Sequence, residues 1–199
     1  MKKILTALAI GAAFAATPAS AQWYVGAGVG TAKGTGSGTT GAAQYSTNSS
    51  RQTSGKIYGG YQFTQNWGIE AQYTDLGRYN YTLTSGAASG TGSAKAQQWG
   101  IAGTGTLPLS NNFYLMAKLG LSANRVSLTP TSVTSGGVTT TVGGNGSKTD
   151  LLAGIGAGYN FNKNLGMRVE YENFGKMANI TNGGTIKGDN FSVSLRYSF

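Results

Sequence analysis

The sequence predicts an all-β protein, an eight-stranded antiparallel transmembrane β-barrel, and three observations carry this prediction. The last eleven residues alternate strictly between apolar and polar side chains and end on Phe199. Seven further segments alternate in the same way, and the links between them alternate between short and long. A barrel in a bilayer presents one face of every strand to lipid and has no open edge, so it accounts for all three.

The terminal segment is the strongest of these signals. Phe191, Val193, Leu195, Tyr197 and Phe199 form one face, and every residue between them is polar. An exposed edge strand with three aromatic residues would be prone to aggregate in a soluble protein. A lipid-facing strand in a closed barrel has no such problem, which favours the membrane.

The first residues predict export. Lys2 and Lys3 precede an apolar run from Ile4 to Ala16, and small residues follow as far as Ala21. This pattern is typical of a secretory signal peptide over residues 1–21, cleaved after Ala21. The alternative, a core or membrane helix, is disfavoured because a spanning helix needs about 20 apolar residues. We therefore expect a single mature barrel domain over residues 22–199.

The composition limits the chemistry. The chain has 33 Gly, 11% charged residues, and neither Cys nor His. It can have no disulfide framework, and it lacks the usual general base and the commonest metal ligand, so we expect no catalytic, cofactor or metal site. The net charge is +9, or +7 once Lys2 and Lys3 are removed. Because the mature basic residues are scattered singly, we expect lipid phosphates or acidic polymers rather than nucleic acid as the partner.

The strands are predicted from period-two alternation with an apolar, outward face. They are Trp23–Thr31, about Gly55–Phe63, Trp67–Asp75, about Ala96–Leu107, Phe113–Arg125, Asp150–Phe161, Leu165–Asn173 and Asp189–Phe199. Residues 64–66, 108–112 and 162–164 form short turns, whereas the links 32–54, 77–95, 126–149 and 174–189 are long and rich in Gly, Ser and Thr. Short periplasmic turns and long extracellular loops are typical of outer-membrane barrels.

The aromatic residues and the long links add detail. Aromatic residues are predicted to form two girdles, a lower one that includes Trp67 and Phe113 and an upper one that includes Tyr73, Trp99, Tyr171 and Phe191. Hairpins are expected to turn at Asn182-Gly183 and at Gly136-Gly137, and Tyr79, Tyr81 and Leu83 to continue the strand that begins at Trp67. Residues 32–54 lack periodicity, and we expect them to be disordered.

Several segments together resemble a known family. They are Trp23-Tyr-Val-Gly-Ala-Gly28, Gly59–Phe63 followed by Asn66–Tyr73, Ala117–Gly120, Arg168–Glu172 and Arg196–Phe199. Over the whole mature chain they resemble the OmpA-type eight-stranded outer-membrane barrels of Gram-negative envelopes. The resemblance implies a monomer whose terminal aromatic residues Phe191, Tyr197 and Phe199 are recognised by the barrel assembly machinery. Full-length family members continue into a peptidoglycan-binding domain, so we do not carry cell-wall anchoring over to this sequence.

The inward face of the predicted barrel carries charge. Its charged members are Lys56, Glu70, Lys118, Arg168, Glu170, Glu172 and Arg196. An eight-stranded barrel is only wide enough inside for side chains, and the four basic and three acidic groups nearly balance, as a buried network requires. In the resembling family, the residues that match Glu70, Lys118, Glu170 and Arg196 form such a plug. Conduction through the lumen is the alternative.

Two segments offer catalytic or binding alternatives. Glu170 and Glu172 lie about 7 Å apart along one strand face, a spacing that a carboxylate-pair hydrolase could use. Arg168 and Arg196 compete for both carboxylates, however, which argues against catalysis. Gly143–Thr149 is similar to a phosphate-binding loop, but Ser147 stands where Gly must precede the Lys.

The predicted function is therefore that of a non-enzymatic outer-membrane barrel in envelope integrity and in surface contact or adhesion through extracellular loops. A narrow porin-like channel for small solutes is the alternative. Arg78, Lys95, Arg125 and Lys148 lie closest to the external strand ends. We expect them to bind lipopolysaccharide phosphates, although keeping the loops soluble is an equal explanation. The sequence identifies no host or surface ligand for the loops.

Overall fold

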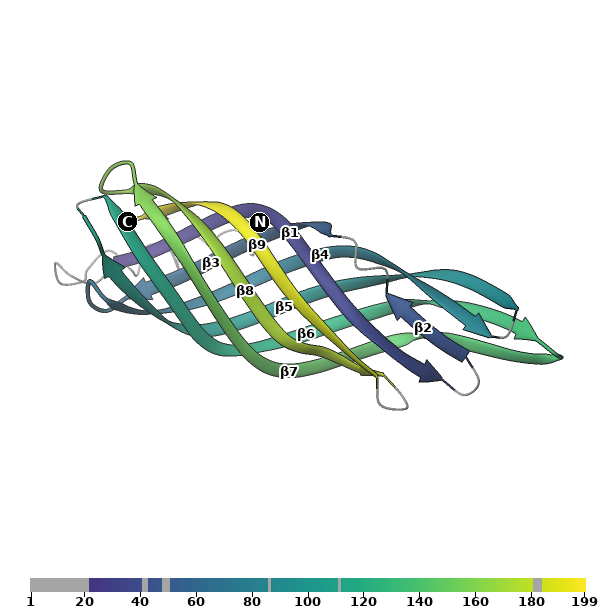
Figure 1. Cartoon of the computed structure of the whole chain (residues 1–199). Helices are drawn as coiled ribbons and strands as arrows, with labels where there is room; N and C mark the ends of the chain where they lie inside the picture. The colour runs from purple at the N-terminus through teal and green to yellow at the C-terminus, as the bar shows by residue number, and fades with distance from the viewer. Residues whose placement is uncertain (1–21, 41–42, 48–50, 86, 111, 181–183) are drawn as a thin grey trace, which may run out of the picture.

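The computed structural model describes residues 22–40, 43–47, 51–85, 87–110, 112–180 and 184–199 (Figure 1). Within them the chain forms nine strands: β1 (Gln22–Thr40), β2 (Ala43–Thr47), β3 (Gln52–Gln62), β4 (Trp67–Ser85), β5 (Ala88–Pro108), β6 (Phe113–Ser135), β7 (Val138–Asn160), β8 (Leu165–Ile180) and β9 (Gly184–Ser198). All strands except β2 pair with their neighbours in chain order, and β9 pairs back onto β1. The predicted closed, eight-stranded antiparallel barrel is confirmed.

Two sequence predictions lie outside the described residues. They are the signal peptide over residues 1–21 and the hairpin tip at Asn182-Gly183, although β8 and β9 pair up to Ile180 and Gly184 beside that tip. In the part of the chain that the structure describes, no helix has both the length and the hydropathy to cross a bilayer.

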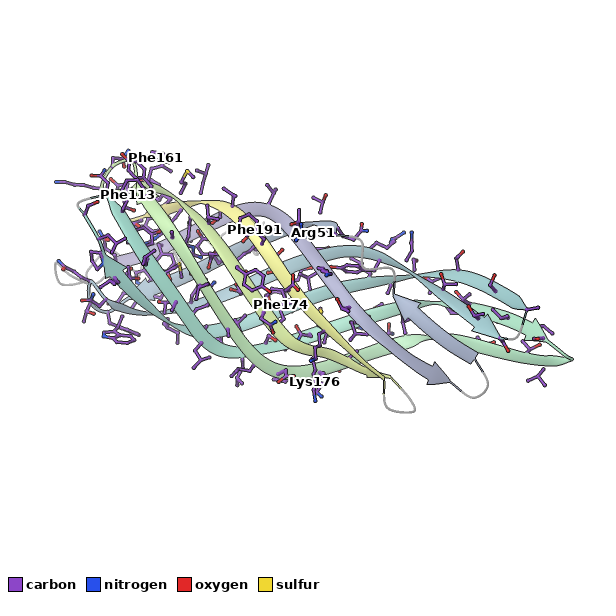
Figure 2. All side chains as sticks on the ribbon, in the orientation of Figure 1. Arg51, Phe113, Phe161, Phe174, Lys176 and Phe191 are labelled. Atoms are coloured by element: carbon purple, nitrogen blue, oxygen red, sulfur yellow. The ribbon has the colours of Figure 1, made fainter. Side chains whose placement is uncertain are left out.

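The outer face of the barrel is apolar, as predicted. Trp67, Trp99 and Phe113 are 67%, 65% and 55% exposed on the isolated chain, and the aliphatic residues of the same strand faces are exposed as well. Figure 2 shows Phe113 and Phe161 together at the end of the barrel that carries the short turns. A closed barrel with an apolar exterior has lipid as its natural environment.

The three short turns share one construction. In each, a backbone N–H donates to the carbonyl of the first residue of the next strand at 2.9 Å: Phe63 to Trp67, Leu109 to Phe113 and Phe161 to Leu165. An Asn just before that strand then reaches the neighbouring hairpin with its amide group: Asn66 to Thr106, Asn112 to Asn160 and Asn164 to Ser198. These bonds satisfy backbone groups where the ladder ends and join the turns into a continuous rim.

The external half differs from prediction. Most of the links 77–95, 126–149 and 174–189 are not loops, because β4 to β9 continue through them as paired strands (Figure 1). Beyond the bilayer, Ser, Thr and Gly replace the apolar residues, so the hydrophobic pattern fades while the backbone ladder continues. The hairpin at Gly136 and Gly137, with φ of 57° and 77°, is confirmed and has the left-handed backbone that such a two-residue turn requires.

The expectation of disorder over 32–54 is wrong for the residues described there. β1 continues to Thr40 beside β9, and the short strand β2 pairs with both β1 and β4. β2 thus fills the position between β1 and β4 above the shorter strand β3 (Figure 1). The sequence of β2 does not alternate, so this strand was not predicted, although it forms a hairpin with the preceding strand β1.

Candidate functional site

An ionic layer crosses the lumen at mid-height. It is formed by six buried side chains from four strands: Lys56, Glu70, Lys118, Arg168, Glu170 and Glu172. Lys118 Nζ lies 2.8, 2.6 and 3.0 Å from carboxylate oxygens of Glu70, Glu170 and Glu172. Three cations meet three carboxylates, so the layer is neutral by itself.

Arg168 and Lys56 complete the layer from β8 and β3. Arg168 binds both carboxylate oxygens of Glu70, at 2.8 and 3.2 Å, and its Nε lies 2.9 Å from Glu170. Lys56 Nζ lies 2.8 and 2.9 Å from Glu170 and Glu172. The contacts of Arg168 Nε and of Lys118 with Glu170 are close in distance but poorly aligned as hydrogen bonds. Ion pairing therefore contributes more there than hydrogen bonding does.

Glycine columns make room for these long side chains. A methyl group on Gly154 would lie 3.0 Å from the Lys118 side chain, and one on Gly156 would lie 3.0 Å from that of Glu170. Both glycines lie on β7, directly opposite Lys118 and Glu170 in the neighbouring strands.

Arg196 requires a correction. Among the described residues, no carboxylate forms an ion pair with it; its guanidinium instead lies 4.1 Å from the Tyr24 ring centre and donates to Gln62 at 3.2 Å. The alternation of side chains along the strand correctly predicted that Arg196 faces the lumen. Alternation does not give the position of a residue along the barrel axis, and Arg196 lies closer to the short-turn end than the ionic layer does.

The lumen also contains an apolar cluster that the sequence did not predict. Directly above the ionic layer, buried apolar side chains form a cluster that includes Leu76, Val126, Leu152, Phe174 and Met177. Phe174 is the next inward residue after Glu172 on β8, so the inner face changes from charged to apolar within one step. In Figure 2 Phe174 lies near the middle of the barrel, away from the short-turn end marked by Phe113 and Phe161. Most of these residues belong to segments that we had assigned to loops.

Three of the four predicted rim cations lie together on the outer surface. Arg78 on β4 is directly opposite Lys95 on β5, and Arg125 on β6 is opposite Gln97, two residues further along β5. All three are exposed, just above the aromatic pair Tyr73–Trp99, although Asp75 approaches Lys95 to 3.4 Å.

Lys148 does not belong with them. It is paired with the buried, inward-facing Asn124, and opposite residues of an antiparallel pair share a face. Lys148 lies in the interior of β7 and not near a strand end, because the strand continues to Val138, and its face is the inner one.

Arg78 follows a bulge whose pattern recurs elsewhere. Asp75 accepts the N–H of Gly77 at 3.0 Å, Gly77 has φ of 80°, and Leu76 turns inward. On β8, Asn173 accepts the N–H of Gly175 at 2.9 Å, Gly175 has φ of 63°, and Phe174 turns inward. In both cases the bulge follows an outward Tyr and precedes an outward cation.

The second bulge reveals a cation pair that the sequence analysis did not select. Lys176 and Lys187 are directly opposite each other on β8 and β9, both exposed, just above the pair Tyr171–Phe191. Figure 2 shows Lys176 on the outside of the barrel. Four places separate β4 from β8 in the eight-stranded ring, so the two cation pairs lie on opposite sides.

A sequence signal for this arrangement exists. Residues 60–78 and 158–176 align without gaps at an offset of 98. Their seven identities are Gly60/Gly158, Tyr61/Tyr159, Phe63/Phe161, Asn66/Asn164, Gly68/Gly166, Tyr73/Tyr171 and Gly77/Gly175. This internal repeat would have placed Arg78 and Lys176 at equivalent positions.

The remaining predicted residues lie on β9. Phe191, Tyr197 and Phe199 point outward, and the rings of Tyr197 and Phe199 contact each other at 5.3 Å. The N–H of Phe199 donates to the Trp23 carbonyl at 3.0 Å, next to the seam between β9 and β1.

The fold and the apolar exterior define an outer-membrane β-barrel. Residues 4–199 match the family model described as outer membrane protein beta-barrel domain, and the chain belongs to this family. The predicted membership of a family of small outer-membrane barrels is confirmed. No curated protein matches the chain.

Solved structures show the same fold at low sequence identity. OprG from Pseudomonas aeruginosa is 13% identical with a TM-score of 0.58, covering 90% of this chain and 96% of its own. Neisserial surface protein A is 22% identical with a TM-score of 0.55, covering 89% and 97%. Ail, the attachment invasion locus protein of Yersinia pestis, solved with the heparin analogue sucrose octasulfate, is 13% identical with a TM-score of 0.54, covering 90% and 99%.

Proposed function

We propose that this protein is a non-enzymatic outer-membrane barrel that acts at the cell surface, in envelope integrity and in contact or adhesion. It is exported by a signal peptide over residues 1–21 and works as a monomer. Its working surface is the external half, where β4 to β7 form two long hairpins (Figure 1).

The observation that carries this proposal is the double closure of the lumen. An ionic layer without uncompensated charge and an apolar cluster lie in series along the axis. Neither provides a polar path for a solute, which argues against the porin-like alternative. Glu170 and Glu172 are both engaged by cations, which leaves neither carboxylate available as a hydrolytic acid or base.

The outer cations support lipopolysaccharide as the lipid partner. Arg78, Lys95 and Arg125 on one side, and Lys176 and Lys187 on the other, lie just above the upper aromatic girdle. Like charges directly opposite each other on a sheet are destabilising unless a counter-charge lies nearby. Asp75 supplies it in part for Lys95. Lipid phosphates at that height would supply it for the other cations, with about 1 kcal/mol for each cation near an anionic surface. Ail carries a sulfated ligand, sucrose octasulfate, in its own structure.

The test is lipopolysaccharide binding by the purified barrel. One variant carries Arg78→Gln, Lys95→Gln and Arg125→Gln, a second carries Lys176→Gln and Lys187→Gln, and a third combines all five. We expect binding at low salt to weaken roughly 10- to 100-fold in the combined variant, with a smaller dependence on salt.

Two single variants serve as controls. Lys163→Gln removes a cation from a short turn at the other end, and Lys148→Gln removes one from the inner face. Both should bind as the wild type does. Wild-type affinity and wild-type salt dependence in the combined variant would exclude the rim as a phosphate site.

Assembly is the second part of the proposal. We infer that Phe191, Tyr197 and Phe199 form the signal recognised by the barrel assembly machinery. Phe199→Ser should then leave unfolded precursor in the periplasm, seen as loss of the heat-modifiable band in membrane fractions. If Phe199 merely anchors the strand in the interface, the band remains and its melting temperature falls.

A further inference from the structure

The barrel has a cavity of about 700 Å³ at its short-turn end. The ends of β1, β3, β5, β6, β7 and β9 and the three turns form its wall, and we call it the periplasmic vestibule. None of the six members of the ionic layer lines it. Its lining includes two cations, Arg196 and Lys163, and no carboxylate side chain.

Arg196 is a charge without a counter-charge. The ionic layer is already balanced, and no carboxylate among the described residues forms an ion pair with Arg196. Its single hydrogen bond goes to Gln62, and its Nε, although buried, has no partner. A partly buried guanidinium with unused donors favours a nearby anion, because burial makes an unpaired charge costly.

Tyr114 provides a second, independent observation. Its side chain is 6% exposed and lines the same vestibule from β6, and its hydroxyl has no hydrogen-bond partner. The ring is fixed by the directly opposite Gly158, because any side chain there would overlap it. Buried hydroxyls in folded proteins almost always have a partner.

We propose that the periplasmic vestibule binds a phosphate-bearing anion through the guanidinium of Arg196 and the hydroxyl of Tyr114, with Lys163 at its mouth. Arg presents a planar fork of donors that matches phosphate oxygens. Donors from β6, β9 and a turn line this one cavity from different parts of its wall, which suits a tetrahedral dianion better than a planar carboxylate. The volume lies within the range of small-molecule sites. The phosphate could be free or could belong to a phospholipid headgroup of the inner leaflet.

The experiment uses the folded barrel in octyl glucoside, a detergent without phosphate. Inorganic phosphate is titrated at constant ionic strength while the Arg196 Nε–H resonance is followed by NMR. We expect a saturable shift. Arg196→Lys keeps the positive charge but removes the planar set of guanidinium N–H donors. Tyr114→Phe keeps the aromatic ring but removes the hydroxyl donor. We expect phosphate affinity to fall about tenfold or more in Arg196→Lys and several-fold in Tyr114→Phe. Binding by Tyr114→Phe is measured on the Arg196 resonance, and binding by Arg196→Lys is measured by phosphorus NMR of the ligand.

Controls separate the possible outcomes. Arg51→Gln removes an exposed cation that belongs neither to the vestibule nor to the lipopolysaccharide rim and should leave phosphate binding unchanged, and gel migration reports folding of each variant. Parallel titrations use short-chain phosphatidylglycerol and acetate. Saturation by phosphatidylglycerol identifies a headgroup as a competent source, and saturation by inorganic phosphate shows that the free anion suffices. An absent or non-saturable shift, equal binding of acetate, or wild-type affinity in Arg196→Lys would overturn the proposal. The result is independent of the lipopolysaccharide rim.

Discussion

At the scale of single residues, Lys118 is the centre of the ionic layer. Its Nζ contacts three carboxylates and also donates to Gln72 at 3.0 Å. Because the layer is neutral, the loss of one cation leaves three carboxylates facing two cations in a space without bulk water. Removing one partner of a buried pair generally costs far more than the intact pair contributes.

We therefore expect Lys118→Met to lower the free energy of unfolding by about 3–5 kcal/mol. The measurement is urea unfolding of the barrel in lipid vesicles, followed by Trp fluorescence. Lys187→Met, an exposed cation, should change stability little. The double variant Lys118→Met/Glu70→Gln restores the balance of charge and should recover part of the loss. Equal stability of the Lys118 and Lys187 variants would contradict a central role for Lys118.

The sequence predicted the inward face of every member of this layer, because parity along a strand is a local property. It did not separate Arg196 from Arg168, although both are inward arginines on adjacent strands. Their heights depend on how the eight strands are staggered around the closed barrel, and stagger is a property of the whole ring.

At the scale of elements, Tyr–Gly pairs hold neighbouring strands at close distance inside the barrel. Tyr24 is directly opposite Gly60, and Tyr58 is directly opposite Gly26. A methyl group on either glycine would overlap the ring across from it. The aromatic ring covers the bare backbone of the neighbouring strand, so each pair fills the lumen without a void.

Two adjacent glycines of β3 give a matched test. A methyl group on Gly60 would overlap the Tyr24 ring and lie 2.7 Å from the Ile69 carbonyl oxygen, whereas one on the outward Gly59 would have ordinary contacts at 3.7 and 3.9 Å. We expect Gly60→Ala to destabilise the barrel by about 1–3 kcal/mol and Gly59→Ala to be nearly neutral. Thermal unfolding by heat-modifiable gel migration measures both. Similar melting temperatures for the two variants would show that Tyr24 moves aside freely.

The elements were predictable mainly where lipid imposes a pattern. Alternation placed β4 from Trp67 to Asp75, and the expectation that Tyr79, Tyr81 and Leu83 continue this strand is confirmed, because β4 reaches Ser85. The bulges at Gly77 and Gly175 shift the parity by one residue, so simple alternation fails from Arg78 and Lys176 onward. The internal repeat at an offset of 98 marks both bulges.

At the scale of the whole molecule, the lumen has three successive regions. The vestibule opens to the short-turn end, the ionic layer follows, and the apolar cluster lies on the external side. We expect the layer to stop ions because its charges are paired, and the cluster to stop them because hydration is lost there. Two barriers in series mean that removing one leaves the other in place.

Recording in planar bilayers tests this series arrangement. We expect no stepwise conductance from the wild type, from Lys118→Ala, or from Leu76→Ala/Phe174→Ala, because each retains one barrier. The triple variant Lys118→Ala/Leu76→Ala/Phe174→Ala should show discrete openings, because it weakens the ionic layer and the apolar cluster together. Each variant must first be shown to be folded by gel migration, because a collapsed barrel would be silent for a different reason. Wild-type openings would favour the porin-like alternative, and openings in Lys118→Ala alone would show that the apolar cluster is no barrier.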